Sequence, residues 1–261
     1  MIWVNGKEIA QEHFSAGELK IKLFPSSREV VDVVWHYEND AELFTIGSIR
    51  EYYMSRPCRL YIPYLPHARM DRVKAEDDVF TLKYFCEVIN SLNFKEVIVK
   101  DVHSNVSLAL LDRVTNKFPK TDIEMVLSDM KNHKKNIALF FPDEGAMKRY
   151  AEHFSQYDFA FGMKKRDWRS GKILGLDILQ KENIVGKDVL IIDDICSKGG
   201  TFYHSAKALL EAGAASVSLY ITHCENSILQ GELFTCGMID KFCTTRSIPH
   251  VAEVAEHFCY V

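Results

Sequence analysis

The stretch 189–201 constrains the fold of this chain more than any other segment, because it joins an apolar strand, two carboxylates and a glycine turn in one order. It opens with four consecutive apolar residues and no polar alternation, which predicts a strand buried on both faces of a parallel sheet. Gly199 and Gly200 then interrupt the chain before a helical apolar pattern that includes Ala206. The end of a buried strand, a turn and the start of a helix therefore coincide at this point.

The residues that follow this strand suit a phosphorylated sugar. Backbone N–H groups of the turn, with the positive end of the helix dipole behind them, can surround a phosphate, and Thr201 adds a hydroxyl donor. Asp193 and Asp194 lie where the hydroxyl groups of a sugar anchored by that phosphate would be. The alternative is an ordinary strand-turn-helix corner, in which Asp194 caps a turn and the glycines only permit a positive φ angle.

Alternating strand and helix patterns continue along nearly the whole chain and predict an α/β protein. Strands are expected at 59–65, 96–101, 137–141, 188–192 and 216–222, and helices at 41–54, 79–91, 145–155 and 201–212. The pattern repeats after about residue 125, so we expect two doubly wound halves with parallel sheets, at 1–125 and 126–249. A C-terminal helix over 250–261 is a candidate to pack on the first half.

Composition narrows the class of protein. The formal net charge of −4 over 261 residues gives no sign of a nucleic-acid or membrane surface. No stretch approaches the roughly 18 apolar residues of a membrane span, and residues 1–7 do not resemble a signal peptide, so we expect a cytoplasmic protein. The seven cysteines include no C-x-x-C pair, which argues against a disulfide framework and a structural zinc site. Most should be buried, while Cys196 could react with thiol reagents.

The stretch 189–201 closely resembles the phosphoribosyl-pyrophosphate (PRPP) signature shared by type I phosphoribosyltransferases and ribose-phosphate pyrophosphokinases. Residues 60–72 distinguish the two families, because they look like the pyrophosphokinase segment that ends in Tyr-Ala-Arg-Gln-Asp-Arg, which simple transferases lack. Further matches to the pyrophosphokinases follow in the same order, at 14–18, 39–40, 101–103, 141–145 and 164–169.

This resemblance implies two domains of the type I phosphoribosyltransferase-like fold. It implies transfer of the β,γ-diphosphoryl group of ATP to the anomeric hydroxyl of ribose 5-phosphate, which gives PRPP and AMP with Mg²⁺ as cofactor. It also implies a homo-oligomer, a dimer or hexamer, in which a neighbouring subunit completes the ATP site. The apolar stretch 19–25 and the aromatic stretch 35–37 could form such contacts or belong to the core.

The resemblance also implies roles for individual residues. The ATP-binding candidates are Phe14, Glu18, Arg69, Met70, Asp71 and Arg72. The ribose-phosphate candidates are Asp193, Asp194, Ser197, Lys198, Gly199, Gly200 and Thr201. The metal-associated candidates are His103 and Asp143. A carboxylate is the better ligand for a hard ion, and His103 could equally hydrogen-bond a metal-bound water.

Lys164 and Arg166 preserve the spacing of the family's catalytic lysine and arginine, which stabilise charge on the transferred group. Alignment through Arg169 would select Lys165 instead and place an aspartate at the arginine position. We expect the basic stretch 164–169, together with 172–182, to form a mobile lid rather than a regular element.

Departures from the family pattern bear on the substrates. Ala16 and Met70 replace Asp and Gln, which removes polar partners near the expected ATP site. Lys198 makes the phosphate loop more positive, as would suit a 5′-diphosphate such as ADP-ribose, the acceptor of short phage-type pyrophosphokinases that serve NAD rebuilding. Alternatively, Lys198 forms an ion pair with Glu182 or with a neighbouring subunit of an ordinary PRPP-forming enzyme. A third hypothesis is a non-catalytic relative, which the retained lysine, arginine and metal residues disfavour.

Overall fold

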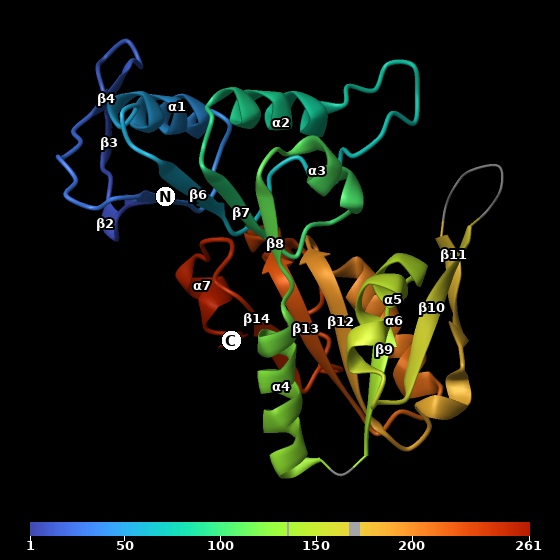
Figure 1. Cartoon of the computed structure of the whole chain (residues 1–261). Coiled ribbons are helices and arrows are strands. Elements are labelled where there is room, and N and C mark those ends of the chain that lie inside the picture. The colour runs from blue at the N-terminus through green and yellow to red at the C-terminus, as the bar shows by residue number, and fades with distance from the viewer. Residues whose placement is uncertain (135, 167–172) are drawn as a thin grey trace. The chain divides into compact units, whose positions relative to one another are not determined.

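The computed structural model describes residues 1–134, 136–166 and 173–261 (Figure 1). The chain forms two compact units, the first from 1–118 with 247–249 and the second from 119–246 with 250–261. Each unit is built around its own sheet and its own apolar core. The boundary expected between 125 and 126 falls inside helix α4 (Lys120–His133), which belongs to the second unit.

The first unit contains eight strands and three helices. In chain order they are β1 (Ile2–Val4), β2 (Lys7–Glu8), β3 (Gln11–His13), β4 (Leu19–Ile21), β5 (Val31–Trp35), α1 (Glu42–Tyr52), β6 (Cys58–Ile62), α2 (Thr81–Ser91), β7 (Glu96–Lys100), α3 (Asn105–Leu110) and β8 (Val114–Lys117). The six-stranded sheet has the order β2-β1-β5-β6-β7-β8, and β3 and β4 form a separate hairpin.

Strands β5 to β8 of this sheet are parallel and follow one another in chain order. Right-handed crossovers that all run in one direction place α1, α2 and α3 on one face of the sheet. The strands accordingly alternate: in β5, Val31, Val33 and Trp35 are buried, and the residues between them are half-buried. Trp35 is part of the core, where its indole N–H donates to the carboxylate of Glu42 at 2.9 Å.

The second unit contains α4 and the elements that follow it. They are β9 (Ile137–Phe141), α5 (Glu144–Tyr150), the 3₁₀ turn η1 (Ala151–Phe154), β10 (Phe159–Arg166), β11 (Ile173–Leu179), η2 (Lys181–Asn183), β12 (Asp188–Cys196), α6 (Gly200–Glu211), β13 (Ser216–Cys224), η3 (Asn226–Gln230), β14 (Lys241–Thr244), α7 (Ala252–Ala255) and β15 (Cys259–Tyr260). The sheet has the order β11-β10-β9-β12-β13-β14-β15.

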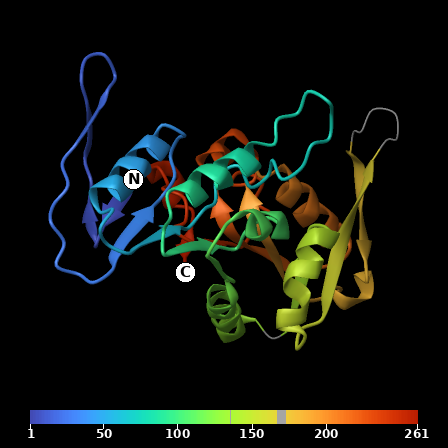
Figure 2. The same ribbon diagram turned by 45° about the horizontal axis from the view of Figure 1, so that its top comes forward.

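The winding direction of the second sheet reverses between β9 and β12. The chain leaves β9 for β10 on one side, whereas it leaves β12 for β13 on the other. Right-handed crossovers then place α5 and α6 on opposite faces of the sheet (Figure 1, Figure 2). The carboxyl ends of β9 and β12 therefore flank a switch point, where open α/β sheets form their ligand crevice. Strand β12 is buried almost throughout, as its apolar run predicted.

The expected strands and helices are confirmed, but two segments differ from expectation. Residues 250–261 form only the short helix α7 and strand β15, which pairs with β14 in the second sheet. Residues 159–166 and 173–179 form the antiparallel hairpin β10–β11 instead of an irregular segment. The backbone pairing between β10 and β11 joins segments whose sequence pattern did not reveal a strand. Residues 167–172, the remaining part of the expected lid, lie outside the described residues.

Candidate functional site in the second unit

Three carboxylates gather at the switch point of the second sheet. Asp143 follows β9, and Asp193 and Asp194 lie near the end of β12. Burial raises the pKa of the Asp193 carboxyl well above its usual range, and the neighbouring carboxylates of Asp194 and Asp143 act in the same direction. Asp193 also accepts a hydrogen bond from the Asp194 backbone N–H at 3.0 Å. Negative charge therefore accumulates at this point of the fold.

Asp143 is the N-cap of α5, where its Oδ1 accepts a hydrogen bond from the Ala146 backbone N–H at 3.1 Å. Gly145 leaves room for this carboxylate, because a Cβ at position 145 would lie 3.2 Å from Asp143 Oδ1. The cap fixes the direction of Asp143, which lies on the same helix as Arg149. Arg149 Nη1 is 3.1 Å from Asp194 Oδ2, so α5 contacts β12 through an ion pair.

The phosphate loop between β12 and α6 turns at Gly199. Its φ angle is +80°, and a Cβ there would lie 2.9 Å from Leu233 Cδ2, so both backbone and space require glycine. Gly200 begins α6, and a Cβ there would meet nothing within 4 Å. Thr201 lies in the first turn of this helix. Strand end, turn and helix N-terminus meet as the sequence predicts, with the helix dipole directed at the loop.

Ser197 is held from behind by a carboxylate that the sequence analysis did not identify. Its hydroxyl donates to Glu225 Oε2 at 2.8 Å, and Ser227 donates to the same oxygen at 3.1 Å. Because a serine has one hydroxyl proton, the Ser197 side chain has no further proton to donate to a ligand. The carboxylate of Glu225 lies beside the phosphate loop. Its negative charge offsets the positive charge that Lys198 adds to this loop.

The ion pair considered between Lys198 and Glu182 does not form within the chain. Glu182 lies in η2, before β12 begins, whereas Lys198 follows the end of that nine-residue strand. The two positions are therefore at opposite ends of the sheet. Lys198 is exposed at the loop surface.

Lys164, Lys165 and Arg166 lie at the end of β10. Strand β10 pairs with β9 only over Phe159 to Phe161, and beyond that point it pairs with β11 alone (Figure 2). Because β10 runs parallel to β9, the three basic positions are on the carboxyl side of the sheet, the side that carries Asp143.

Cys196 is buried behind the phosphate loop beside Cys224, its register partner on β13. The hydrogen bond with Cys224 and burial raise the pKa of the Cys196 thiol well above its usual range. Both effects disfavour the thiolate, so the expected reactivity toward thiol reagents is not supported. The other buried cysteines are Cys58, Cys86, Cys224 and Cys243, as predicted.

Candidate residues in the first unit

The nucleotide candidates of the first unit follow neighbouring parallel strands. The loop 63–72 follows β6, and His103 follows β7, so both lie at one edge of the sheet. Within the loop, Arg69, Met70 and Arg72 are exposed and Asp71 is buried. Arg72 Nε is 3.2 Å from Asp71 Oδ1. The loop therefore displays two guanidinium groups, as the sequence predicted.

His67 fixes this loop in an unusual conformation. Its φ angle is +61°, a left-handed value that costs energy for any residue but glycine, and its carbonyl accepts from the Met70 N–H at 2.8 Å. The imidazole Nε2 lies 2.8 Å from Asp40 Oδ1, which also accepts from the Tyr37 hydroxyl at 2.9 Å. The hydrogen bond from His67 lowers the pKa of Asp40. Asp40 and His67 thus tie the loop to the start of α1.

The remaining nucleotide candidates lie on the β3–β4 hairpin (Figure 1). Phe14 is 55% exposed, and its N–H donates to the Glu18 carbonyl at 2.9 Å across a turn at Gly17. Glu18 lines a cavity of about 560 Å³ between the hairpin and α1, whose lining includes neither Phe14 nor Arg69. Phe14 and Arg69 therefore do not line the cavity that Glu18 lines.

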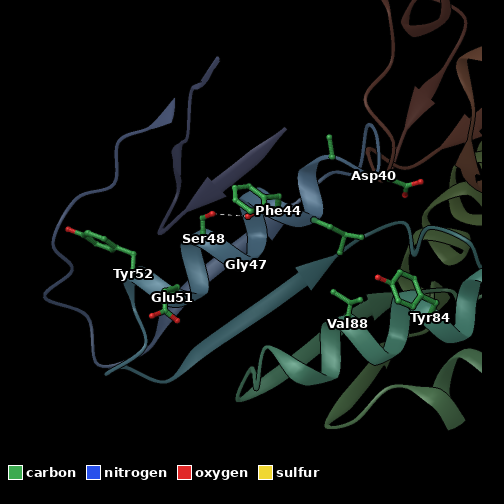
Figure 3. A pocket seen from close by; sticks show the side chains of 10 residues that line it. Asp40, Phe44, Gly47, Ser48, Glu51, Tyr52, Tyr84 and Val88 are labelled. Atoms are coloured by element: carbon green, nitrogen blue, oxygen red, sulfur yellow. Dashed lines mark hydrogen bonds between the residues drawn. The ribbon is translucent and has the colours of Figure 1, made fainter. Parts of the chain in front are cut away.

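A larger groove, of about 820 Å³, lies between α1 and α2 (Figure 3). It is lined by Asp40, Ala41, Leu43, Phe44, Gly47, Ser48, Glu51, Tyr52, Tyr84 and Val88. Its walls are mainly apolar, and the Ser48 hydroxyl bonds to the Phe44 carbonyl of its own helix. Since no lysine or arginine lines it, the groove does not suit a phosphorylated ligand.

Sequence reasoning missed Arg149, Glu225 and Ser227. Glu225 could have been found, because it ends the strand predicted beside the PRPP motif, and the carboxyl ends of neighbouring parallel strands meet at one edge. Arg149 could not have been found from the sequence, because α5 also carries Lys148. Only the packing of the helix determines which of these two residues faces β12.

The part of the chain that the structure describes has neither a preformed metal cluster nor a membrane-spanning helix. No group of three His, Cys, Asp or Glu side chains there is arranged as a metal site. Nor does any helix within those residues have the length and apolarity needed to cross a membrane.

Comparison with known proteins supports the motif analysis. No family model matches the sequence. The ribose-phosphate pyrophosphokinase of Rhizobium meliloti is 30% identical over 223 residues, which cover 82% of this chain and 69% of that protein. Ribose-phosphate pyrophosphokinase 2 of Archaeoglobus fulgidus is 28% identical over 239 residues, 88% of this chain and 81% of its own. The match to the Marinomonas enzyme covers 61% of that protein.

The fold agrees with these relatives. The crystal structure of phosphoribosylpyrophosphate synthetase from Mycobacterium smegmatis superposes with a TM-score of 0.79, over 97% of this chain and 85% of that one, at 17% identity. Both units thus share the type I phosphoribosyltransferase-like architecture of that enzyme. On its sequence identity and coverage, this chain belongs to the ribose-phosphate pyrophosphokinase family.

Proposed function

We propose that this protein transfers the β,γ-diphosphoryl group of ATP to the anomeric hydroxyl of ribose 5-phosphate, forming PRPP and AMP. The observation that carries the proposal is the switch-point site of the second unit. There, two carboxylates at the end of β12 lead through the Gly199 turn into the N-terminus of α6. Names of the relatives and the motif at 60–72 agree with this activity.

In this proposal, the loop 197–201 and the carboxylates of β12 bind different parts of the acceptor sugar. Backbone N–H groups of the loop 197–201 and the α6 dipole bind the 5′-phosphate, and Thr201 adds a hydroxyl. Asp193 and Asp194 accept hydrogen bonds from the ribose hydroxyls and orient the sugar. Orientation of the acceptor supplies much of the rate in such transfers, since the chemistry needs little covalent help from the protein.

Lys164 and Arg166 are the proposed cationic groups for the transferred phosphates. Their place on β10, on the carboxyl side of the sheet, supports this assignment over a purely solvated basic stretch. Phe14, Glu18 and the loop 69–72 are the proposed nucleotide contacts. Because Phe14 is exposed at a hairpin tip, we propose that it serves the site of a neighbouring subunit in a homo-oligomer.

The residues present fit Mg²⁺. Asp143 and Asp193 are oxygen donors, and the pKa of Asp193 is raised first by burial and then by its neighbouring carboxylates, whose repulsion a cation would relieve. Such a site suits an ion that retains most of its waters and binds through one or two carboxylates. Asp143 would hold it, and His103, which belongs to the first unit, stays a candidate metal-associated residue on the strength of its motif. When bound, Mg²⁺ neutralises the triphosphate and polarises the attacked phosphorus.

The acceptor can be tested directly. The purified protein is incubated with ATP and Mg²⁺ and with ribose 5-phosphate or ADP-ribose in parallel, and products are identified by mass spectrometry. We expect AMP and diphosphorylated ribose 5-phosphate. Absence of AMP release and of product with both acceptors would contradict the proposal.

Lys198 gives a specific reason to include ADP-ribose, because it is exposed on the loop and cannot reach Glu182. If it binds a second phosphate, Lys198→Thr weakens use of ADP-ribose and spares ribose 5-phosphate. An equal loss with both acceptors would exclude that role. Lys187→Thr, at the opposite end of β12, is the matched control.

A further inference from the structure

Helix α5 carries two side chains that reach the carboxylate cluster. Asp143 caps its N-terminus, and six residues later Arg149 forms the ion pair with Asp194. The side chain of Arg149 is 21% exposed and that of Asp194 only 6%. This pair is therefore largely withdrawn from water, unlike the exposed Lys148–Glu144 pair of the same helix, whose side chains are 69% and 66% exposed.

A buried carboxylate needs a partner, because desolvation of an unpaired charge is costly. Asp193 and Asp143 lie beside Asp194, and burial together with these neighbouring carboxyls raises the pKa of Asp193. Arg149 supplies a positive charge to this cluster from α5, and its Nη1 meets Asp194 Oδ2 at 3.1 Å as an ion pair without hydrogen-bond geometry.

We infer that Arg149 is a positioning residue for the acceptor sugar. It holds Asp194 Oδ2 toward α5 and so sets the orientation in which Asp193 and Asp194 receive the ribose hydroxyls. The same helix fixes Asp143, so α5 aligns the sugar carboxylates with the carboxylate proposed to hold the metal. This inference rests on the proposed function, but it assigns a task to a residue outside the PRPP motif.

The test compares Arg149→Gln and Arg149→Lys with the control Lys148→Gln, which removes one charge from the neighbouring exposed pair of α5. Binding of ribose 5-phosphate is measured by calorimetry, and KM and kcat are measured with each substrate varied. We expect Arg149→Gln to raise KM and Kd for ribose 5-phosphate about tenfold or more, the effect of losing a fixed buried contact. KM for ATP should change less than about twofold.

Arg149→Lys should recover part of the loss, because it restores the charge without the planar fork. Lys148→Gln should behave as the wild type. Unchanged ribose 5-phosphate binding in Arg149→Gln would overturn the inference, as would an increase in the KM for ATP as large as that for the sugar.

A double-substitution cycle separates positioning from a general loss of folding. If Arg149 acts through Asp194, adding Arg149→Gln to Asp194→Asn causes little further loss of ribose 5-phosphate binding. Thermal unfolding should show the same dependence. The midpoint temperature of the double variant should be higher than that of Arg149→Gln alone. Additive effects in both measurements would show that Arg149 acts independently of Asp194.

The outcomes also distinguish this inference from the proposed function. If the wild-type protein binds no ribose 5-phosphate, the function fails and the sugar-positioning role fails with it. Normal binding by the wild type together with normal binding by Arg149→Gln contradicts the positioning role alone.

Discussion

The two units place their candidate residues at the same kind of sheet edge but hold them differently. In the first unit the parallel strands follow chain order, so the winding has no reversal between β5 and β8. Both arginines of its loop 63–72 are exposed to solvent. A surface contact between His67 and Asp40 connects this loop to the start of α1. In the second unit the winding reverses between β9 and β12, and buried carboxylates meet at that point.

This difference indicates that residues at a switch point are held in place by more contacts than residues on a loop at an ordinary sheet edge. At the switch point, Asp194 is positioned by a buried strand, by α5 and by an ion pair. Arg69 lies on an exposed loop, whose turn depends on the left-handed backbone of His67. Substitutions in the second unit should therefore have larger effects than substitutions in the first.

The largest expected effect is on activity in Asp193→Asn. Loss of a ribose-orienting carboxylate should reduce kcat/KM about 100-fold or more. The same change removes a carboxyl whose ionised form is disfavoured by burial and by Asp194 and Asp143, so the folded protein should keep or gain stability. Steady-state kinetics and chemical denaturation check both parts. A variant that is active, or inactive only because it unfolds, would contradict the assignment of Asp193.

The next effect is on stability, in Gly199→Ala. The φ angle of +80° and the 2.9 Å approach to Leu233 predict a loss of about 2 kcal/mol in the free energy of unfolding. Gly200→Ala is the matched control, because position 200 begins a helix and has open space around its Cβ. It should be neutral or slightly stabilising. Equal destabilisation by both substitutions would show that the Gly199 turn is not the constraint.

A smaller effect is expected from His67→Ala in the first unit. Loss of the contact with Asp40, whose side chain is 62% exposed, should raise the KM for ATP about threefold. The KM for ribose 5-phosphate should be unchanged. Asparagine tolerates the left-handed backbone, so His67→Asn should be milder than His67→Ala. Lys83→Gln, which removes an exposed ion pair of α2, is the control. An effect as large as that of Asp193→Asn would refute the ranking of the two units.

The smallest effect concerns pH. Burial lowers the pKa of His250, whose ring contacts the Cys224 carbonyl at 2.8 Å at the end of β13. The unfolded chain therefore binds a proton more readily than the folded one, and stability should fall as pH decreases below about 6.5, the unperturbed value for histidine. Thermal unfolding of wild type and His250→Gln across pH 5 to 8 checks this. The two midpoints should converge at acidic pH; a constant difference would exclude the coupling.

The sequence predicted the α/β class and the central strands of the second sheet because these buried parallel strands are continuous apolar stretches. β9, β12 and β13 were all located in this way. It did not predict most of the outer strands of the two sheets, such as β8, β11 and β15, whose pairing depends on neighbours distant along the chain. It placed the domain boundary inside α4 for a similar reason, since that amphipathic helix has no linker before or after it to mark the division.

For the candidate site, the sequence by itself determined the phosphate loop and the family, because Asp193, Asp194 and Gly199 are constrained by local backbone geometry within one short stretch. Which groups surround that stretch depends on the tertiary structure. Arg149 and Glu225 lie about 45 residues before Asp194 and about 28 after Ser197, and they reach the loop because β9, β12 and β13 are neighbours in the sheet. Charge pairing of this kind depends on packing between elements, which no local pattern encodes.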